Sequence, residues 1–260
     1  MELGLNNRKA LVLGASRGLG AAIARALAAE GVHVYAAARN TAAIAEWAGA
    51  LPAGFGRVES IALDLADVAS VDATAARLIA SGGVDILVNN TGGPPPAAAV
   101  DAQRSDWLGH FEAMAANVFH LTNALLPGMR ERRWGRVLTI ASSGVEQPIP
   151  RLALSNGIRS ALIGWSKTLA SEVAADGVTV NVILPGRIHT QRVDELDAAA
   201  AGRTGRNVAD IAAESAASIP AGRYGRSEEF AAVAVFLASE AASYVTGTKI
   251  RVDGGAIRSI

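Results

Sequence analysis

The sequence contains no cysteine, which excludes disulfide bonds, thiolate metal sites and a cysteine nucleophile together. It also lacks a net charge, since 24 Lys and Arg residues balance 24 Asp and Glu residues and the cations form no basic block. We therefore expect no metal site and no nucleic-acid or membrane partner. No apolar run approaches the ~18 residues of a membrane span, and MELGLNNRK has no apolar signal core. These absences predict a cytoplasmic protein.

What the sequence has instead is an alternation of short β-rich runs with long Ala-rich helical stretches. This alternation is typical of parallel strands joined by crossover helices, and 260 residues suit one domain, residues 1–260. We predict the α/β class, a doubly wound sheet of seven parallel strands. The predicted strands are Ala10–Leu13, His33–Ala37, Val58–Leu63, Asp85–Asn89, Arg136–Ile140, Thr179–Leu184 and Lys249–Val252. Irregular stretches at 92–96, 144–151 and 186–205 follow strand ends, at the edge where open α/β sheets bind ligands.

A glycine-rich turn follows the first strand, in the stretch LVLGASRGLG. The apolar run breaks at Gly14, and the chain passes Gly18 and Gly20 into a helix-like run. Such a strand-turn-helix lets the backbone approach a pyrophosphate, which the helix N-terminus attracts through its free N–H groups and its dipole. The spacing alone is not specific, so its context decides.

Two arginines indicate which dinucleotide this turn binds. The second strand ends at Arg39, where a cofactor with a free ribose 2′-hydroxyl calls for an acidic residue. Arg17 offers a second cation inside the turn. Together they favour the 2′-phosphate of NADPH over NADH, although Arg39 also fits a solvated strand-end charge. Asp64, which ends the third strand, fits either an adenine contact or the cap of the next helix.

Several motifs together resemble the short-chain dehydrogenase/reductase family, most closely its 3-oxoacyl-carrier-protein reductase branch. They are GASRGLG, the pair DL at 64–65, DILVNNTGG, RVLTIASSG, VTVNVILPGRIHT and ASYVTGTKIRVDGG, in family order over nearly the whole chain. The resemblance implies a single Rossmann-type domain, a nicotinamide cofactor and a homotetramer. Thr91 departs from the family's usual alanine. The cofactor-contacting positions that the resemblance implies are Gly14, Ser16, Arg17, Gly18, Leu19, Arg39, Asp64, Leu65, Asn90, Gly92, Pro185, Gly186, Ile188 and Thr190.

The catalytic positions that the resemblance implies are different. The family catalyses with Asn, Ser, Tyr and Lys, and only Ser142 is in place. Counting 13 residues on from Ser142 reaches Ser155 where the Tyr is expected, and four further residues reach Arg159 where the Lys is expected. Met114 stands where the Asn is expected. A serine hydroxyl is a far weaker acid than a phenol of pKa ~10, and arginine stays charged, so the usual proton donor is missing.

Three outcomes fit this change. The protein reduces a conjugated carbonyl or a similarly activated substrate, with Ser142 and Arg159 stabilising an oxyanion. Alternatively, it reduces a carbonyl such as a 3-oxoacyl group with a relocated acid, for which His110, His120 and His189 are candidates, although His189 also fits a solvent-facing residue. In the third outcome it binds NADPH and catalyses nothing.

The chain's ending, DGGAIRSI, and the missing pair also resemble a divergent branch that includes bacilysin-pathway reductases. These act on a conjugated, carboxylate-bearing ketone, which implies that Arg159 or Arg192 holds a carboxylate. The Pro94–Pro96 run predicts a stiff loop, or an ordinary rigid turn, beside the site. Residues 191–215, polar and rich in Ala and Gly, predict a mobile helical lid over the substrate. Tyr224 and Tyr244 are not expected to replace the phenol.

Overall fold

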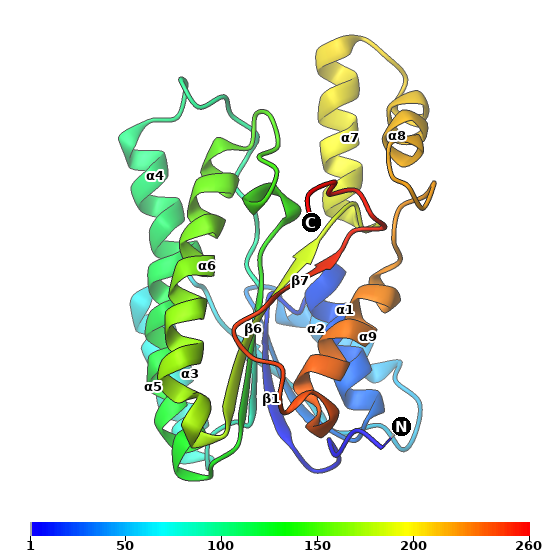
Figure 1. Ribbon diagram of the computed structural model, residues 1–260. Helices are drawn as coiled ribbons and strands as arrows, with labels where there is room; N and C mark the ends of the chain where they lie inside the picture. The colour runs from blue at the N-terminus through cyan, green and yellow to red at the C-terminus, as the bar shows by residue number, and fades with distance from the viewer. Residues whose placement is uncertain (1) are drawn as a thin grey trace.

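A seven-stranded parallel sheet forms the centre of the computed structural model, which describes residues 2–260 (Figure 1). The strand order is β3-β2-β1-β4-β5-β6-β7, and every neighbouring pair is parallel. The strands are β1 (Lys9–Leu13), β2 (His33–Ala38), β3 (Val58–Ala62), β4 (Ile86–Asn89), β5 (Gly135–Ile140), β6 (Val178–Pro185) and β7 (Lys249–Val252). Each predicted strand is confirmed, with its ends within one residue.

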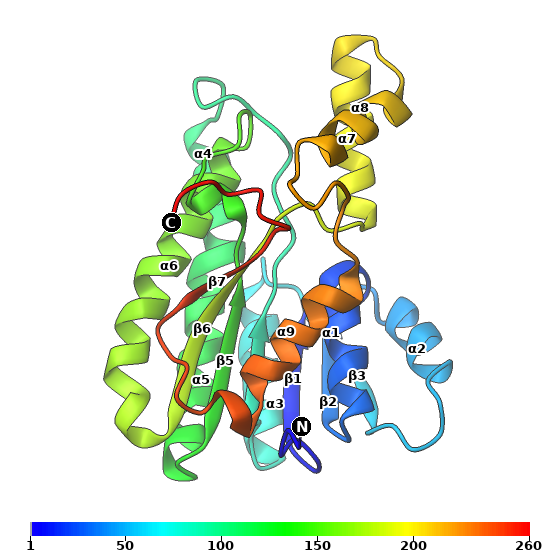
Figure 2. The same cartoon turned by 45° about the vertical axis from the view of Figure 1, so that its right-hand side comes forward.

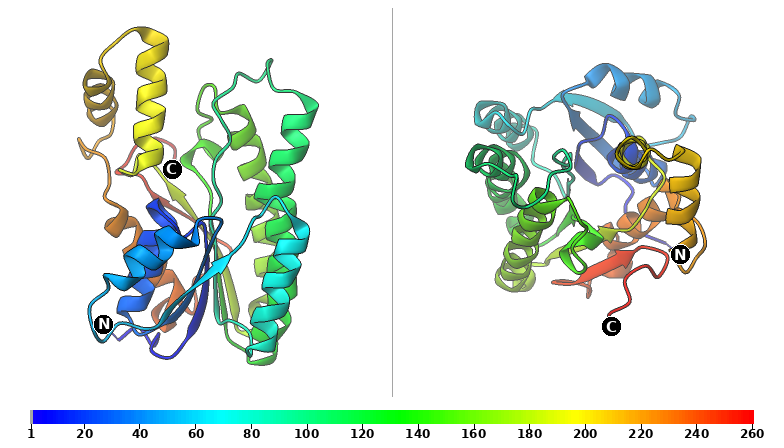
Figure 3. Two further views of the ribbon diagram at one scale, coloured as in Figure 1. Left: turned by 180° about the vertical axis from the view of Figure 1, so that it is seen from behind. Right: turned by 90° about the horizontal axis from the view of Figure 1, so that it is seen from above.

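Helices cover both faces of the sheet, as Figure 3 shows from above. One layer contains α1 (Gly18–Ala29), α2 (Thr41–Gly49) and α9 (Ser227–Ala238), and the other contains α3 (Val68–Ala80), α5 (Asn117–Glu131) and α6 (Ala153–Val173). Two apolar cores result, one on each side. In the first, Ile23 and Phe230 pack against strand residues such as Val12; in the second, Leu121 and Leu169 lie with Leu11. Adjacent β1 residues thus enter opposite cores, which is the side-chain alternation of a strand buried on both faces.

The strand order reverses between β1 and β4. From β1 the chain builds outward to β2 and β3, and then it crosses to β4 and continues to β7 on the other side. In open α/β sheets, the loops at such a switch point diverge and leave space for a ligand beyond the carboxyl ends of the strands. The glycine-rich turn follows β1 and the Asn90–Gly92 segment follows β4, so both begin at this point.

Two further features lie at or beyond the carboxyl edge of the sheet. The helix α4 (Arg104–Phe111) joins α5 through a π-helical segment, Glu112–Ala116. The helices α7 (Gln191–Thr204) and α8 (Val208–Ala217) stand beyond the strand ends as a pair (Figure 2). The prediction that 186–205 is irregular was therefore wrong from Gln191 onward, because these Ala-rich residues form α7. The segment expected to be a helical lid, 191–215, corresponds to α7 and most of α8. None of the described helices is both long and apolar enough to cross a bilayer.

Candidate functional site

Glycine is favoured at three positions in and after the turn that follows β1. Gly14 and Gly18 have φ angles of 61° and 58°, in the left-handed region that side chains disfavour. A Cβ on Gly14 would lie 2.7 Å from the Nδ2 of Asn90. A Cβ on Gly20 would lie 2.3 Å from the carbonyl oxygen of Gly14. The glycines thus allow the turn to pack against the start of its own helix, the close approach that dinucleotide-binding turns use.

Three hydrogen bonds fix this turn to the sheet and to α2. Asn90 donates from Nδ2 to the carbonyl oxygen of Leu13, over 3.1 Å. The Ala15 amide donates to the carbonyl of Ala37 at 3.1 Å, and the Trp47 indole donates to the carbonyl of Ala15 at 3.1 Å. The family resemblance implies a cofactor contact for Asn90, and in the structure its side chain supports the turn. A rigid turn needs little reorganisation when a phosphate binds.

The helix after the turn leaves its first N–H groups available. Arg17 is the N-cap of α1, and no side chain makes a capping hydrogen bond there. These orphan donors and the positive dipole end favour an anion. The Arg17 side chain is exposed, and its Nη1 lies 3.5 Å from Oε1 of Glu195 on α7.

The ends of β2 and β3 carry the next two predicted residues. Arg39 is exposed, and no ion-pair partner for it exists within residues 2–260. Asp64 accepts a hydrogen bond from the amide of Ala66 at 3.0 Å, so it forms a local turn. The cap of α3 is Asp67, which accepts from the amide of Ala69 at 3.0 Å. The interpretation of Asp64 as a helix cap was therefore wrong, because the helix begins one turn later.

Arg159 is the centre of the second half of the site. It lies on α6, is buried, and reaches the ends of two strands through its guanidinium group. Nε donates to the hydroxyl of Ser155 at 3.3 Å, and Nη1 donates to the carbonyl of Ile140 at 3.0 Å. Nη2 donates to the carbonyls of Thr91 at 3.2 Å and Gly92 at 3.4 Å. One side chain thus joins α6 to the carboxyl ends of β4 and β5.

The charge of Arg159 has no acidic partner in the part of the chain that the structure describes. Burial, and secondarily the charge of Arg192, lowers the pKa of the Arg159 guanidinium to about 10. Arg159 therefore stays protonated at neutral pH. Four of its five N–H groups are used by the hydrogen bonds above, which leaves one Nη1 hydrogen for a ligand oxygen. A buried, uncompensated cation favours negative charge developing beside it.

Ser142 and Met114 complete the catalytic positions that the sequence singled out. The Ser142 Oγ accepts a hydrogen bond from the amide of Gly144 at 3.0 Å, and its own hydrogen remains available. Met114 is buried in the π-helical segment, in an apolar cluster with Leu154 and Ile158 of α6. The methionine thus contributes packing between α5 and α6. Its position in a π-helical segment is one that often marks functional sites.

The segment from Pro185 to Thr190, which leads into α7, packs closely on the sheet. A Cβ on Gly186 would lie 2.7 Å from the Cα of Asp253, and Ile188 is buried and pairs with Gly225. These contacts fix the course of the chain from Pro185 to Thr190.

A buried carboxylate that the sequence did not reveal connects α7 to the segments at its base. Asp197 of α7 accepts from Nη1 of Arg187 at 2.6 Å and from the hydroxyl of Tyr224 at 2.8 Å. Burial is the main cause that raises the pKa of the Tyr224 phenol. The aspartate is 10 residues from one partner and 27 from the other, so no local pattern could have found this cluster.

The three candidate histidines lie apart from one another. His120 contacts Asp72 at 2.6 Å between α5 and α3, and His110 lies near the end of α4. His189 is 70% exposed and lies 3.5 Å from Asp194 at the start of the lid. Only His189 is at the carboxyl edge of the sheet beside the cofactor turn, where Thr190 lies next to Gly18.

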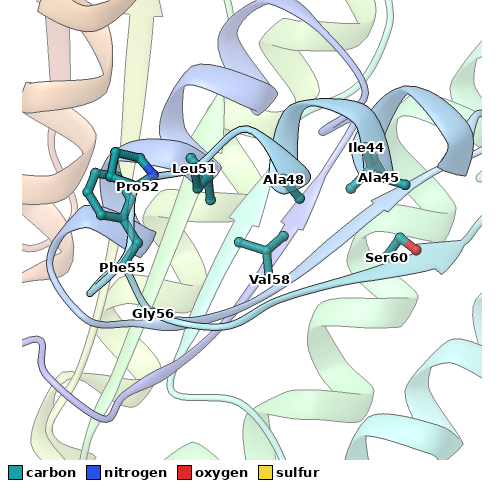
Figure 4. Close-up of a pocket in the computed structure, with 10 residues that line it drawn as sticks. Ile44, Ala45, Ala48, Leu51, Pro52, Phe55, Gly56, Val58 and Ser60 are labelled. Carbon is teal, nitrogen blue, oxygen red and sulfur yellow. The ribbon is translucent and has the colours of Figure 1, made fainter.

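A hollow of about 450 Å³ lies elsewhere, between α2 and β3 (Figure 4). The residues that line it include Ile44, Leu51, Phe55 and Val58. No titratable side chain lines it, so it offers no group for proton or hydride chemistry. Within residues 2–260 there is also no cluster of three or more His, Cys, Asp or Glu residues arranged to hold a metal.

The fold and the glycine turn define a Rossmann-type nucleotide-binding protein, and comparisons with known proteins agree. Residues 14–256 match the family described as Enoyl-(Acyl carrier protein) reductase. The 3-oxoacyl-[acyl-carrier-protein] reductase FabG of Escherichia coli (strain K12) is 37% identical over 250 residues, which cover 95% of this chain and 96% of FabG.

Solved structures show the same likeness. L-sorbose reductase from Gluconobacter frateurii, complexed with NADPH and L-sorbose, is 34% identical with a TM-score of 0.93, and the match covers 100% of both chains. YwfH, an NADPH-dependent reductase involved in bacilysin biosynthesis, is 29% identical with a TM-score of 0.93, over 98% of this chain and 100% of that one. The chain belongs to the short-chain dehydrogenase/reductase family and is an oxidoreductase of that type.

Proposed function

We propose that the protein is an NADPH-dependent reductase that transfers hydride to an activated small molecule, such as a conjugated carbonyl compound, without a tyrosine acid. The observation that carries the proposal is the buried Arg159, which holds Ser155 at one turn's distance on α6. By the family register, these residues occupy the positions of the usual Lys and Tyr. The relatives named above support the reductase part of the proposal, and two of their names specify NADPH.

The residues at the carboxyl edge fit NADPH. The turn leaves no room for a Cβ at Gly14 or Gly20, the N-terminus of α1 has free donors, and Arg39 has no acidic partner in the described chain. The Oγ1 of Thr91 is also buried without a hydrogen-bond partner within residues 2–260. When bound, NADPH supplies the hydride. The residues proposed to hold it are Gly14, Ser16, Arg17, Gly18, Leu19, Arg39, Asp64, Leu65, Asn90, Gly92, Pro185, Gly186, Ile188 and Thr190.

The proposed catalytic residues are Ser142, Ser155 and Arg159. Their chemistry follows from the hydrogen bonds and protons that they can donate. Arg159 holds positive charge in a buried position, and the Ser142 hydroxyl donates a hydrogen bond, so both stabilise an oxyanion formed on the substrate. Neither group gives up a proton readily at neutral pH. A substrate whose negative charge is delocalised, as in an enolate, suits this site because solvent can protonate it afterwards.

The test is a panel of quinones, enones, 3-oxoacyl thioesters and imines, assayed with NADPH and the purified protein. We expect turnover of conjugated acceptors and little reduction of 3-oxoacyl thioesters. Tight NADPH binding without turnover of any member would instead identify a silent NADPH-binding protein. Efficient reduction of 3-oxoacyl thioesters would contradict the proposal and favour a relocated acid, with His189 the first residue to replace.

We also propose a homotetramer, which the family resemblance implies. Beside the edge strand β7 lies a hollow of about 260 Å³ that Ile163, Val180 and Val182 help to line. Such a surface suits contact with a second copy of the chain. Light scattering should give about four times the chain mass of 26.6 kDa, and a monomeric mass at micromolar concentration would contradict the assembly.

A further inference from the structure

The first turn of α7 connects the two halves of the site. At one end, Glu195 lies 3.5 Å from Arg17 of the glycine turn, measured from Oε1 to Nη1. At the other end, Arg192 donates from Nη2 to the carbonyl of Pro94, after β4, at 2.8 Å. Within the turn, the Nη1 of Arg192 lies 3.5 Å from the second oxygen of Glu195. A chain of contacts therefore runs from Arg17 through Glu195 and Arg192 to Pro94.

Glu195 is shared between two cations, with one oxygen facing each. The side chains are 61% exposed for Arg17, 41% for Glu195 and 39% for Arg192, so each ion pair is weak and easily exchanged. Arg17 has no other acidic partner in the part of the chain described. It is also one of the two arginines assigned above to the cofactor's 2′-phosphate. The Glu195 carboxylate is therefore paired with an arginine that the 2′-phosphate also binds.

We infer that Glu195 is a specificity-determining residue that competes with the cofactor's 2′-phosphate for Arg17. This inference rests on the proposed NADPH site. A phosphate of charge roughly −2 is the stronger acceptor and displaces the carboxylate, which keeps Arg192 as its partner. NADH has no 2′-phosphate, so it leaves the Arg17–Glu195 pair in place. Glu195 thus weakens NADPH binding without affecting NADH binding, and it links occupation of the phosphate site to the first turn of the lid.

The experiment measures dissociation constants for NADPH and NADH by titration calorimetry on two neighbouring charge changes. Glu195→Gln should tighten NADPH binding about threefold, the size expected for an exposed ion pair, and leave NADH binding unchanged. Asp194→Asn is the matched control, because it removes the same charge from the same turn, where the carboxylate faces His189. The control should leave both constants near wild type. The gain in Glu195→Gln should shrink at high salt.

The Arg17→Ala background separates this inference from the proposed cofactor site. Arg17→Ala alone should weaken NADPH binding about tenfold and spare NADH. In that background, Glu195→Gln should have no further effect on either cofactor. If Arg17→Ala leaves NADPH binding unchanged, the phosphate assignment itself is wrong. If Arg17→Ala weakens binding but Glu195→Gln behaves like Asp194→Asn, or its effect persists without Arg17, the competition is overturned while the NADPH site stands.

Discussion

The Nε of Arg159 lies 3.3 Å from the hydroxyl oxygen of Ser155, one turn earlier on α6. In this bond the guanidinium donates and the serine oxygen accepts, so the Ser155 hydroxyl keeps its own hydrogen but remains a far weaker acid than a phenol. The same guanidinium also holds the carbonyls that end β4 and β5. Arg159 therefore combines a structural role at the carboxyl edge with the positive charge that the proposed chemistry uses.

Replacing Arg159 tests whether the reaction depends on this side chain. Arg159→Ala should reduce kcat/KM or NADPH affinity by at least about tenfold, because the buried charge and the bridge between two strand ends are both lost. Arg104→Ala, an exposed arginine at the start of α4, is the control and should behave as wild type. Steady-state kinetics and cofactor titration measure both effects. Wild-type kinetics in Arg159→Ala would mean that the arginine takes no part in the reaction.

The pH dependence of Arg159→Lys gives a sharper test. Burial lowers the pKa of Arg159 to about 10, well below the ordinary arginine value, so folding disfavours its charged form. At neutral pH the proton is bound in both the folded and the unfolded states, and this group gives no pH dependence of stability there. The cost of burying its charge is relieved only as the pH rises above about 10.

In the lysine variant, the same burial lowers the pKa of the ammonium below its ordinary ~10.4. We expect Arg159→Lys to lose activity at a lower pH than the wild type, whose guanidinium stays charged up to about pH 10. The measurement is kcat against pH with a conjugated acceptor. Superimposable profiles would show that the charge at this position is not used.

Restoring the family's pair should restore its usual chemistry. In Ser155→Tyr/Arg159→Lys, a phenol and a lysine occupy the positions that the proposed register aligns with the family's pair, so a proton donor for a simple alkoxide becomes available. Reduction of 3-oxoacyl thioesters should rise by about tenfold or more over the wild type. The control is Ser160→Tyr/Arg159→Lys, which puts the phenol on an exposed position of the same helix. Equal rates in the two variants would argue against the register that aligns Ser155 with the tyrosine.

Arg39 should set the cofactor preference together with Arg17. Arg39→Asp replaces the exposed cation at the end of β2 by an acid that repels a 2′-phosphate and accepts from a ribose hydroxyl. We expect NADPH affinity to fall at least about tenfold and the preference to shift towards NADH. Arg57→Asp, at the opposite end of the neighbouring strand, is the control. An unchanged preference in Arg39→Asp would remove this residue from the phosphate site.

The sequence predicts the strands and the glycine turn well and the contacts between distant elements poorly, for physical reasons. Buried parallel strands are continuous apolar runs, so stretches such as Thr179–Leu184 could be recognised locally. The glycine turn was equally visible, because its backbone angles and close contacts require glycine at Gly14 and Gly20. The π-helical segment and the role of Asn90 as a support for the turn depend on contacts between distant elements, and no spacing in the sequence predicts them.

Asp197 shows what such a distant contact does, and it gives the last prediction. The carboxylate is 3% exposed and accepts from Arg187 and Tyr224, so it holds α7 to the two segments at its base. Asp197→Asn removes the charge and an acceptor, and it should lower the free energy of unfolding by about 2 kcal/mol. Trypsin should also cut faster after Arg203, in the last turn of α7, and after Arg206, just beyond the helix.

Two further variants serve as comparisons for Asp197→Asn. Asp210→Asn, on the exposed face of α8, should change neither stability nor proteolysis. Tyr224→Phe removes only one of the two hydrogen bonds, and it should cost about 1 kcal/mol of stability while retaining turnover. Its phenol donates a hydrogen bond to Asp197 and has a raised pKa, which suits a structural role and not that of a proton donor. A large loss of kcat in Tyr224→Phe, with the lid still resistant to trypsin, would instead make this tyrosine the missing acid.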